Sequence, residues 1–353
     1  MATSPSPSPS QTPTTSITHL HIKKPSSLDA NQWSISTLEC QNVQKALETH
    51  GFFLVKYHDD QEQEQDECSL LHETFSSMNQ LFNLPRETKL KNSSPTPYYT
   101  YFRTSAVYET LAVVNSSSSS GQLLSFTQLM WPHGNQKFYE TMRRMSGKLI
   151  ELSKIILCML CKSYGVIGRT ELDHSAADHE ATMDPLFRMI KYSAPPSNNN
   201  NDGDGDGDND EDEEPILKLT PHTDQNFVTV LCQNEVDGLM CKPRDGEWMK
   251  VNPSPGSFIV LAGDALKVWS NGRIHAPLHK VMMKGKKDRL SFGMFIGPKG
   301  DKVVEVFDEF VDEEEERAAL FKPFIFLDYL NYALENVSIA DTLLDSFACI
   351  NSA

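Results

Sequence analysis

Two histidines and one aspartate have the types and spacing of a metal-binding group. His222 and Asp224 lie one residue apart in LKLTPHTD, which we predict to be a strand. Side chains at positions i and i+2 of a strand point to the same face, so an imidazole and a carboxylate could bind one ion. His279, on a later apolar segment, is our candidate for the third ligand, and His275 is the alternative. Three ligands on one side of a metal would leave the opposite positions open for other molecules.

A second pair of polar residues follows ten positions after His279. Arg289 and Ser291 again share one face of a predicted strand. A guanidinium offers a planar fork of donors, and a hydroxyl beside it completes a holder for a carboxylate. The chain therefore combines a predicted metal site with a predicted carboxylate site.

These residues lie in a part of the chain that predicts many short strands. From about residue 187, apolar segments such as FRMIKY, FVTVLCQ and LSFGMFI alternate with turn residues, a pattern typical of an antiparallel sandwich or barrel. The dipeptide Asp237-Gly238 predicts a hairpin between FVTVLCQ and LMCK. The other expected elements are a helix and strand within 36–57, helices over 66–81 and 137–164, and a helical tail over about 318–344.

Charge and composition exclude several classes of protein. The 353 residues include 48 acids and 32 bases, for a net charge of −16, and no run of Lys and Arg offers a footprint for nucleic acid. The longest apolar stretch, 149–161, is interrupted by charges and is shorter than the ~20 residues of a membrane span. The seven cysteines are scattered, and Cys158 and Cys161 lie in an apolar helical segment, so we expect reduced thiols and a cytoplasmic protein.

An acidic tract, residues 197–214, interrupts the strand region with nine acids and no base. The pattern of a calcium-binding loop is met there by Asp202, Asp204, Asp206, Gly207 and Glu213. We predict a disordered surface loop instead, because no helix is expected on either side and Asn209 stands where such a loop has an apolar residue. A calcium-binding protein is the alternative that this tract leaves open.

The motifs together resemble the plant 2-oxoglutarate- and Fe(II)-dependent dioxygenases. That family shows His-x-Asp, a distal His some fifty residues later and Arg-x-Ser ten residues after it, and this chain has all three in order. The segments THGFFLV, LFNLPRETK and DGEWMKVNPSPGSFIVLAGD also resemble the family, and the resemblance covers roughly residues 18–345. LMWPHGN, MIKYSAP and NGRIHAPLHKVMM are similar to the branch containing glucosinolate side-chain-modifying enzymes and related oxygenases of specialised metabolism.

The resemblance implies a fold that is mainly β with flanking α: a double-stranded β-helix (a cupin-like jelly roll) with N-terminal helices and a C-terminal helix. The expected organisation is a disordered tail over 1–17, a mostly helical region over 18–185, the dioxygenase core over 186–310 with the insertion 197–214, and a helical region over 311–353.

The resemblance also implies roles for the motif residues. His222, Asp224 and His279 would bind Fe(II), and Arg289 and Ser291 would hold the distal carboxylate of 2-oxoglutarate. The reaction would consume O2, release succinate and CO2, and oxidise a small plant metabolite or hormone, with ascorbate as a supporting reductant. Hydroxylation is the expected outcome, and desaturation or demethylation are alternatives.

Tyr192, at the end of FRMIKY, matches a family position that contacts the same carboxylate. Ile190 replaces the Asn that the family has two residues earlier, so no hydrogen bond to the cosubstrate is expected from that position.

Substrate contacts are expected from aromatic side chains. Tyr99, Tyr101 and Phe102 would form a lid, while Phe227 and Phe295 would line the barrel, with packing as the alternative for each. We expect a monomer that takes a small-molecule substrate and has no nucleic-acid or membrane partner. A catalytically silent metabolite-binding protein is the other alternative, although the motif residues are all retained.

Overall fold

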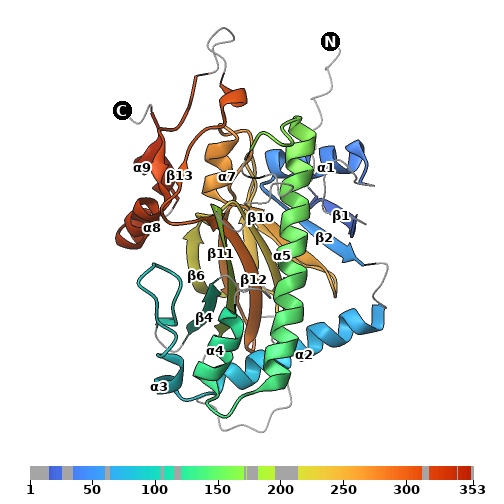
Figure 1. The fold of residues 1–353 in the computed structure, drawn as a ribbon, viewed down its shortest axis with the longest axis vertical. Coiled ribbons are helices and arrows are strands. Elements are labelled where there is room, and N and C mark those ends of the chain that lie inside the picture. The colour runs from blue at the N-terminus through green and yellow to red at the C-terminus, as the bar shows by residue number, and fades with distance from the viewer. Residues whose placement is uncertain are drawn as a thin grey trace, which may run out of the picture.

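The protein is built around two facing β-sheets, with helices packed on the outer face of the larger one (Figure 1). The computed structural model describes residues 16–25, 35–59, 64–104, 107–114, 121–170, 172, 182–194, 214–311, 318–339 and 341–350. The predicted tail, except for its last two residues, and the acidic tract up to residue 213, with its calcium-loop pattern, lie outside the described residues.

The strands are β1 (His19–Lys23), β2 (Phe52–His58), β3 (Phe102–Thr104), β4 (Tyr108–Val114), β5 (Met183–Tyr192), β6 (Ile216–His222), β7 (Val228–Gln233), β8 (Leu239–Lys242), β9 (Met249–Lys250), β10 (Phe258–Ala262), β11 (Leu278–Met283), β12 (Arg289–Pro298), β13 (Val303–Val304) and β14 (Phe324–Ile325). The helices are α1 (Thr37–Thr49), α2 (Glu64–Phe82), α3 (Arg86–Lys89), α4 (Gln122–Met130), α5 (Gln136–Tyr164), α7 (Asp264–Trp269), α8 (Phe326–Glu335) and α9 (Leu343–Ala348). Two short 3₁₀ turns cover Asp308–Phe310 and Val337–Ile339.

The two large sheets have the topology of a double-stranded β-helix, as predicted. The larger sheet has the strand order β1-β2-β10-β7-β12-β5-β4-β3, and the smaller has the order β6-β11-β8-β9. All of these pairs are antiparallel except β1 with β2. Strands that follow one another in the sequence therefore often lie in different sheets, which is how a jelly roll closes over an interior.

Side-chain alternation along the large sheet separates two apolar cores. On β12, Leu290, Phe292 and Met294 pack in the core beneath the helices, whereas Arg289 and Ser291 face the smaller sheet. The same alternation runs through β5, β7 and β10, since neighbouring residues of a strand point to opposite faces. The second core, between the sheets, is smaller and leaves room for polar residues. The helices therefore pack on the outer face of the large sheet, and Arg289 and Ser291 lie on its inner face.

Helix α5 is the main support of the outer face (Figure 1). It packs against α1, α2 and α4 and against strands β7 and β12. Asn135 begins the helix by accepting a hydrogen bond from the Phe138 amide, and Gly165 ends it at φ 73°. Both cysteines of the CxxC pair are buried in this helix, as predicted. The helix before β2 is also confirmed, with a capping box between Ser36 and Glu39.

Two predicted elements are wrong. Asp237-Gly238 does not form a hairpin, because β7 belongs to the large sheet and β8 to the small one. Gly238 is instead a point of close approach, where an added Cβ would lie 2.8 Å from the Met282 carbonyl oxygen. The helical tail is broken into β14, α8 and α9, and Phe321 forms a bridge with Cys349. The helix starts only at Phe326 because Phe324 and Ile325 pair with β13 as strand β14.

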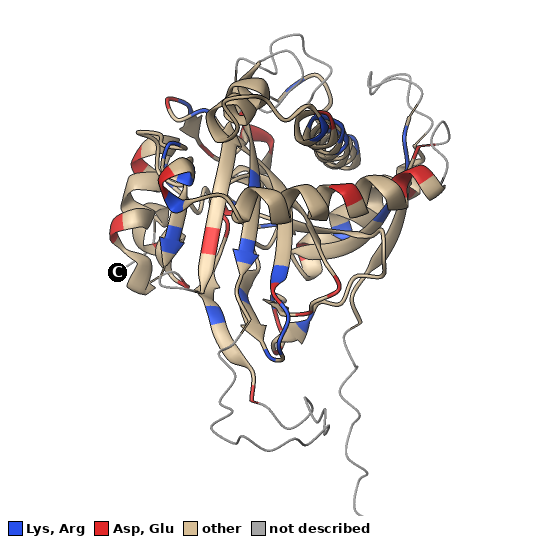
Figure 2. Ribbon diagram, turned by 90° about the horizontal axis from the view of Figure 1, so that it is seen from below, with Lys and Arg blue, Asp and Glu red and all other residues tan. Residues whose placement is uncertain are grey.

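Charged residues of both signs occur on many of the helices and strands. Figure 2 shows basic and acidic positions interspersed along helices and strands. Among the described helices, none is both long enough and apolar enough to span a membrane.

Gly51, at the turn between α1 and β2, should be sensitive to substitution. Its φ is 79°, and an added Cβ would lie 2.4 Å from the backbone oxygen of His275. Gly51→Ala should lower the free energy of unfolding by about 2 kcal/mol or more, since it adds a backbone clash to the cost of a left-handed conformation. Gly165→Ala is the matched control, because its φ is also positive but its Cβ would meet nothing within 4 Å, so a loss of only about 1 kcal/mol is expected. Equal losses in chemical denaturation would contradict this account.

Candidate metal centre and cosubstrate pocket

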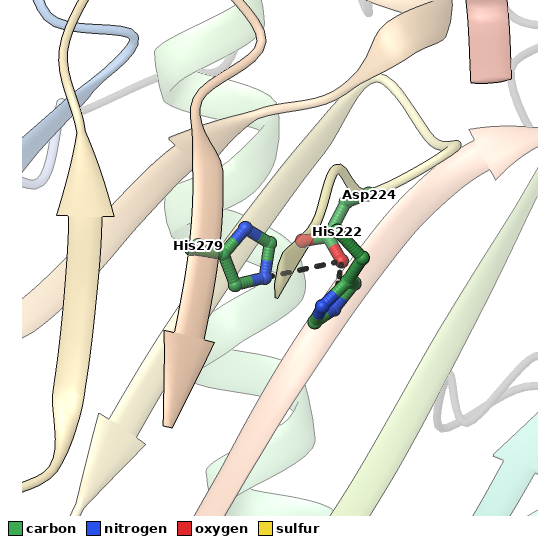
Figure 3. A group of neighbouring side chains, drawn as sticks. All are labelled: His222, Asp224 and His279. Atoms are coloured by element: carbon green, nitrogen blue, oxygen red, sulfur yellow. Dashed lines mark ion pairs between the residues drawn. The ribbon is translucent and has the colours of Figure 1, made fainter. Parts of the chain in front are cut away.

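His222, Asp224 and His279 converge at one end of the space between the sheets (Figure 3). One ligand atom from each lies within 4.8 Å of the others. Asp224 Oδ1 is 4.0 Å from Nε2 of His222 and 3.7 Å from Nε2 of His279. These separations are too long for hydrogen bonds, yet they are short enough for one ion to contact all three atoms. Among the described residues, this is the one such group of three.

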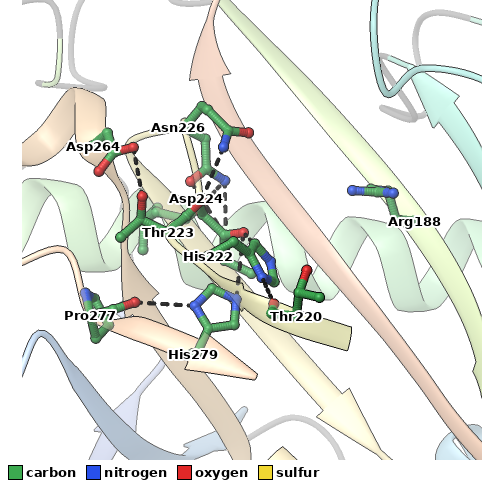
Figure 4. Close-up of polar contacts among 12 residues, drawn as sticks. Arg188, Thr220, His222, Thr223, Asp224, Asn226, Asp264, Pro277 and His279 are labelled. Atoms are coloured by element: carbon green, nitrogen blue, oxygen red, sulfur yellow. Dashed lines mark hydrogen bonds and ion pairs between the residues drawn. The ribbon is translucent and has the colours of Figure 1, made fainter. Parts of the chain in front are cut away.

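Strand pairing places the two histidines opposite each other. His222 on β6 pairs directly with His279 on β11, and their ring centroids are 4.2 Å apart. Nδ1 of His222 lies 2.9 Å from the Thr220 carbonyl oxygen, and Nδ1 of His279 lies 3.1 Å from that of Pro277 (Figure 4). A carbonyl only accepts hydrogen bonds, so each Nδ1 carries the proton and each Nε2 keeps a free lone pair directed at Asp224.

Electrostatics keep His222 ready to bind a cation. Desolvation of its ring, together with the nearby His279, lowers the pKa of His222 to about 4. The ring is therefore neutral near pH 7, and no proton has to leave before a metal binds.

Asp224 reaches the site from a turn, which differs from the sequence prediction. β6 ends at His222, so the shared strand face does not extend to the carboxylate. The turn is held instead by Asp264, whose amide donates to the Asp224 carbonyl at 2.7 Å and whose Oδ2 accepts from the Thr223 hydroxyl at 2.9 Å (Figure 4). Thr229 Oγ1 donates to Asp224 Oδ2 at 2.6 Å, which leaves Oδ1 facing the histidines.

Asp264 links this turn to the C-terminal region. The Tyr329 hydroxyl on α8 donates to Asp264 Oδ2 at 2.6 Å. Burial raises the pKa of Asp264 to about 6, while its hydrogen bonds to Tyr329 and Thr223 favour the charged form. A carboxylate that accepts bonds from two elements fixes the turn that carries Asp224.

Arg289 and Ser291 lie on the inner face of β12, as their spacing predicts. Both are only 1% exposed. The Arg289 guanidinium donates to Gln233 Oε1 at 2.8 Å and to Ser291 Oγ at 3.4 Å. Its Cζ is 5.2 Å from the ring centroid of Tyr192, which is paired with it across β5 and β12. The predicted carboxylate holder is therefore assembled around one buried cation.

Among the described residues, no carboxylate forms an ion pair with Arg289, and its Nε is buried without a hydrogen-bond partner. Burial lowers the pKa of this guanidinium, although it remains charged at neutral pH. A buried cation without a counter-charge is costly, so the site is built to receive an anion. Arg289, Ser291 and Tyr192 line the same cavity as the three candidate metal ligands.

The other predicted site residues are divided among several places. Phe295 lines this cavity and a neighbouring one, and Tyr99 lines the neighbouring one. Phe227 packs in the core beneath the helices, and Phe102 on β3 is 49% exposed. The Tyr101 hydroxyl donates to Glu109. These last three line neither of the two cavities beside the metal centre.

His275, the alternative ligand, lies outside the metal centre. Its Nε2 is 3.2 Å from the Lys242 carbonyl oxygen, and it lines a separate cleft with Arg244 and Lys267. Of the two candidate histidines, His279, ten residues before Arg289, is therefore the one that lies with His222 and Asp224.

Three polar residues of the site were missed from the sequence: Gln233, Thr229 and Arg188. Gln233 pairs with Ser291 across β7 and β12, and Thr229 follows the turn of Asp224. Only Arg188 carried a local signal, because it precedes Tyr192 by four residues on a strand and must share its face.

The donor set fits iron. Two neutral imidazoles and one carboxylate on one side of a cavity are the ligands of the facial triad in non-haem Fe(II) oxygenases. The side of the metal site without protein ligands faces the cavity that contains Arg289, so a dicarboxylate could contact both the metal and Arg289.

Comparisons with known proteins agree with this chemistry. The 2OG-Fe(II) oxygenase superfamily matches residues 189–298, and the N-terminal region of non-haem dioxygenases in morphine synthesis matches residues 26–118. A probable 2-oxoglutarate-dependent dioxygenase from Arabidopsis thaliana, AOP1, is 37% identical over 327 residues, which cover 92% of each chain. The 2-oxoglutarate-dependent dioxygenase AOP2 of the same plant is 28% identical and covers 82% of this chain and 88% of its own.

Solved structures share the fold. The rice dioxygenase for auxin oxidation aligns with a TM-score of 0.70 and 24% identity, over 95% of this chain and all of the other. JOX2, in complex with 2OG, Fe and JA, aligns with a TM-score of 0.64 and 20% identity, over 89% of this chain and 84% of the other. The protein therefore belongs to the 2-oxoglutarate- and Fe(II)-dependent dioxygenases and is an oxidoreductase.

Proposed function

We propose that this enzyme hydroxylates a small plant metabolite, with Fe(II) bound by His222, Asp224 and His279 and 2-oxoglutarate held by Arg289 and Ser291. One observation carries the proposal: a three-ligand metal centre and a buried arginine without a counter-charge line the same cavity. Fe(II) and 2-oxoglutarate, when bound, supply the oxidation of a C–H bond by O2, with release of succinate and CO2.

The chain's own residues position and shield this chemistry. Arg289 would bind the distal carboxylate of the cosubstrate through its planar fork of donors, with Gln233 and Ser291 fixing the orientation of the fork. The backbone carbonyls of Thr220 and Pro277 keep the histidine Nε2 atoms directed at the metal. Leu231, Leu261 and other apolar residues line the same cavity and would exclude water.

The relatives support a small metabolite as substrate. Solved neighbours include dioxygenases for auxin oxidation and a complex of JOX2 with JA, and the curated relatives include AOP1 and AOP2. Hydroxylation is our choice among the reactions open to this cofactor set, and desaturation or demethylation are its competitors.

Succinate formation would test the proposed function. The purified enzyme, Fe(II), ascorbate, 2-oxoglutarate and O2 are incubated with fractions of a plant-metabolite extract. The active fraction is then analysed by mass spectrometry, where hydroxylation adds about 16 Da, desaturation removes about 2 Da and demethylation removes about 14 Da. Succinate without any oxidised product, or no succinate in any fraction, would contradict the proposal.

His279→Ala should abolish both Fe(II) binding and succinate formation. Removal of one of three ligands should weaken Fe(II) binding at least about 100-fold, more than the loss of a group that only orients a ligand. His275→Ala is the matched control, because this ring lies in the separate cleft. Fe(II) titration of both variants measures the effect, and iron binding lost in His275→Ala but retained in His279→Ala would reverse the assignment.

Arg289→Lys should weaken 2-oxoglutarate binding by about 10- to 150-fold. The amine keeps the charge but loses the planar fork, which corresponds to about 1.5–3 kcal/mol for a hydrogen bond to a charged group. The affinity is measured without O2, from the visible charge-transfer absorption of the Fe(II)–2-oxoglutarate complex. Fe(II) affinity should remain unchanged, and an unchanged affinity for 2-oxoglutarate would show that another residue holds its carboxylate.

A further inference from the structure

Arg188 is a second arginine on the inner face of the large sheet. It lies four residues before Tyr192 on β5, and it is paired with Gly293 on β12 and Ala112 on β4. These two neighbours are small, so they leave the guanidinium free to extend between the sheets. In Figure 4 it lies beside the metal centre without a marked contact to any labelled residue.

The position of Arg188 connects two cavities. The first contains the metal centre and Arg289, and the second is lined by Tyr98, Tyr99 and residues of α8. Three residues line both cavities: Arg188, Asp224 and Phe295. Arg188 therefore stands where a molecule in the second cavity would approach the metal.

The polar contacts of Arg188 leave its charge uncompensated. Among the described residues, no carboxylate forms an ion pair with it, and its Nε is buried without a hydrogen-bond partner. Its Nη2 donates to the Tyr108 hydroxyl at 3.4 Å, a long contact, and its Cζ lies 5.4 Å from the Phe295 ring centroid. A partly buried cation held only in this way favours an anionic partner.

When Fe(II) and 2-oxoglutarate are bound, the positive charge of Arg188 has no matching negative charge in the metal cavity. Asp224 and the two carboxylates of 2-oxoglutarate carry three negative charges, and a divalent iron with Arg289 carries three positive charges. These six charges balance, and the charge of Arg188 remains. Asp184, the other carboxylate that lines the second cavity, has Lys299 rather than Arg188 as its basic neighbour. A substrate with one negative charge would neutralise the charge of Arg188.

We propose that Arg188 binds the anionic group of the substrate, and that the substrate is a small organic anion with an apolar body. Phe295, Tyr98 and Tyr99 would pack against that body in the second cavity. The proposal rests on the proposed function, because it takes the metal cavity to be filled by 2-oxoglutarate. It extends that function by naming the substrate class and the residue that selects it.

The test compares two anionic ligands with a neutral ligand that has the same benzyl body. The probes are phenylacetate, phenylmethanesulfonate and phenylacetamide, titrated without O2 into the Fe(II)–2-oxoglutarate enzyme. Binding is followed by the change in the visible charge-transfer absorption. At least one anion should bind about 10-fold or more tightly than the amide, the gain expected from a charge-assisted hydrogen bond. The anion that binds more tightly indicates whether the substrate carries a carboxylate or a sulfonate.

The variants identify the residue responsible. Arg188→Leu should remove the preference for the anion, and Arg188→Lys should retain part of it, while both keep the wild-type affinity for 2-oxoglutarate. Arg103→Leu, an exposed arginine on β3, is the matched control and should behave as the wild type. The same ligands are also tested by thermal melting without metal in an Arg289→Leu background, so that the anion cannot bind at the empty cosubstrate site. The anion should raise the melting temperature when Arg188 is present but not when it is replaced in Arg188→Leu.

Each contrary result has a distinct meaning. The proposal is overturned if neither anion binds better than the amide, or if Arg188→Leu keeps the preference. It is also overturned if Arg188→Leu loses 2-oxoglutarate affinity as strongly as Arg289→Lys, since Arg188 would then serve the cosubstrate. If the wild type binds no Fe(II) or no 2-oxoglutarate, the proposed function fails, whereas the melting experiment without metal still decides whether Arg188 selects anions.

Discussion

His222 and His279 face each other across β6 and β11, and the metal centre depends on this pairing. A slip of one residue would turn either histidine to the opposite face of the small sheet. The metal centre therefore belongs to the small sheet, while Arg289 and Ser291 belong to the large one. Sheets that face each other are about 10 Å apart, so a cosubstrate that reaches both must cross the interior. A dicarboxylate, with one acidic group at each end, suits this arrangement.

The interior tolerates its charges because they are arranged in complementary groups. Asp224 faces two imidazoles, and Asp264 accepts hydrogen bonds from Thr223 in the turn of Asp224 and from Tyr329 on α8. The two arginines lie on neighbouring strands of the opposite sheet, each with a buried Nε that has no partner. Uncompensated buried cations cost stability, and proteins retain such groups where ligands supply the missing charge. The same electrostatics that bind the cosubstrate would then also select an anionic substrate.

Local sequence patterns predicted the parts of the site that lie within one strand. Arg289 and Ser291 share a face because β12 is regular, and Arg188 could have been found by extending the same count from Tyr192. Asp224 does lie with the two histidines, but not through a shared strand face, because it follows the strand and depends on a turn fixed by Asp264. Gln233 could not be predicted, because its contact with Arg289 requires the pairing of β7 with β12, which no local pattern encodes. The hairpin predicted between β7 and β8 failed for the same reason, because no local pattern encodes that these two strands join different sheets.

The second cavity shows how one scaffold could serve different substrates. Its wall combines the loop of Tyr98 and Tyr99, Phe295 of β12, and Phe326 and Leu330 of α8. Tyr98 has a φ of 66°, a costly conformation for a tyrosine that only the surrounding packing can maintain. The loop and α8 lie outside the sheets that carry the metal and cosubstrate residues, while β5, β12 and the turn of Asp224 complete the wall. Changes in the loop and in α8 could therefore reshape the substrate space while the register of β6, β11 and β12, and with it the oxidative chemistry, stays the same.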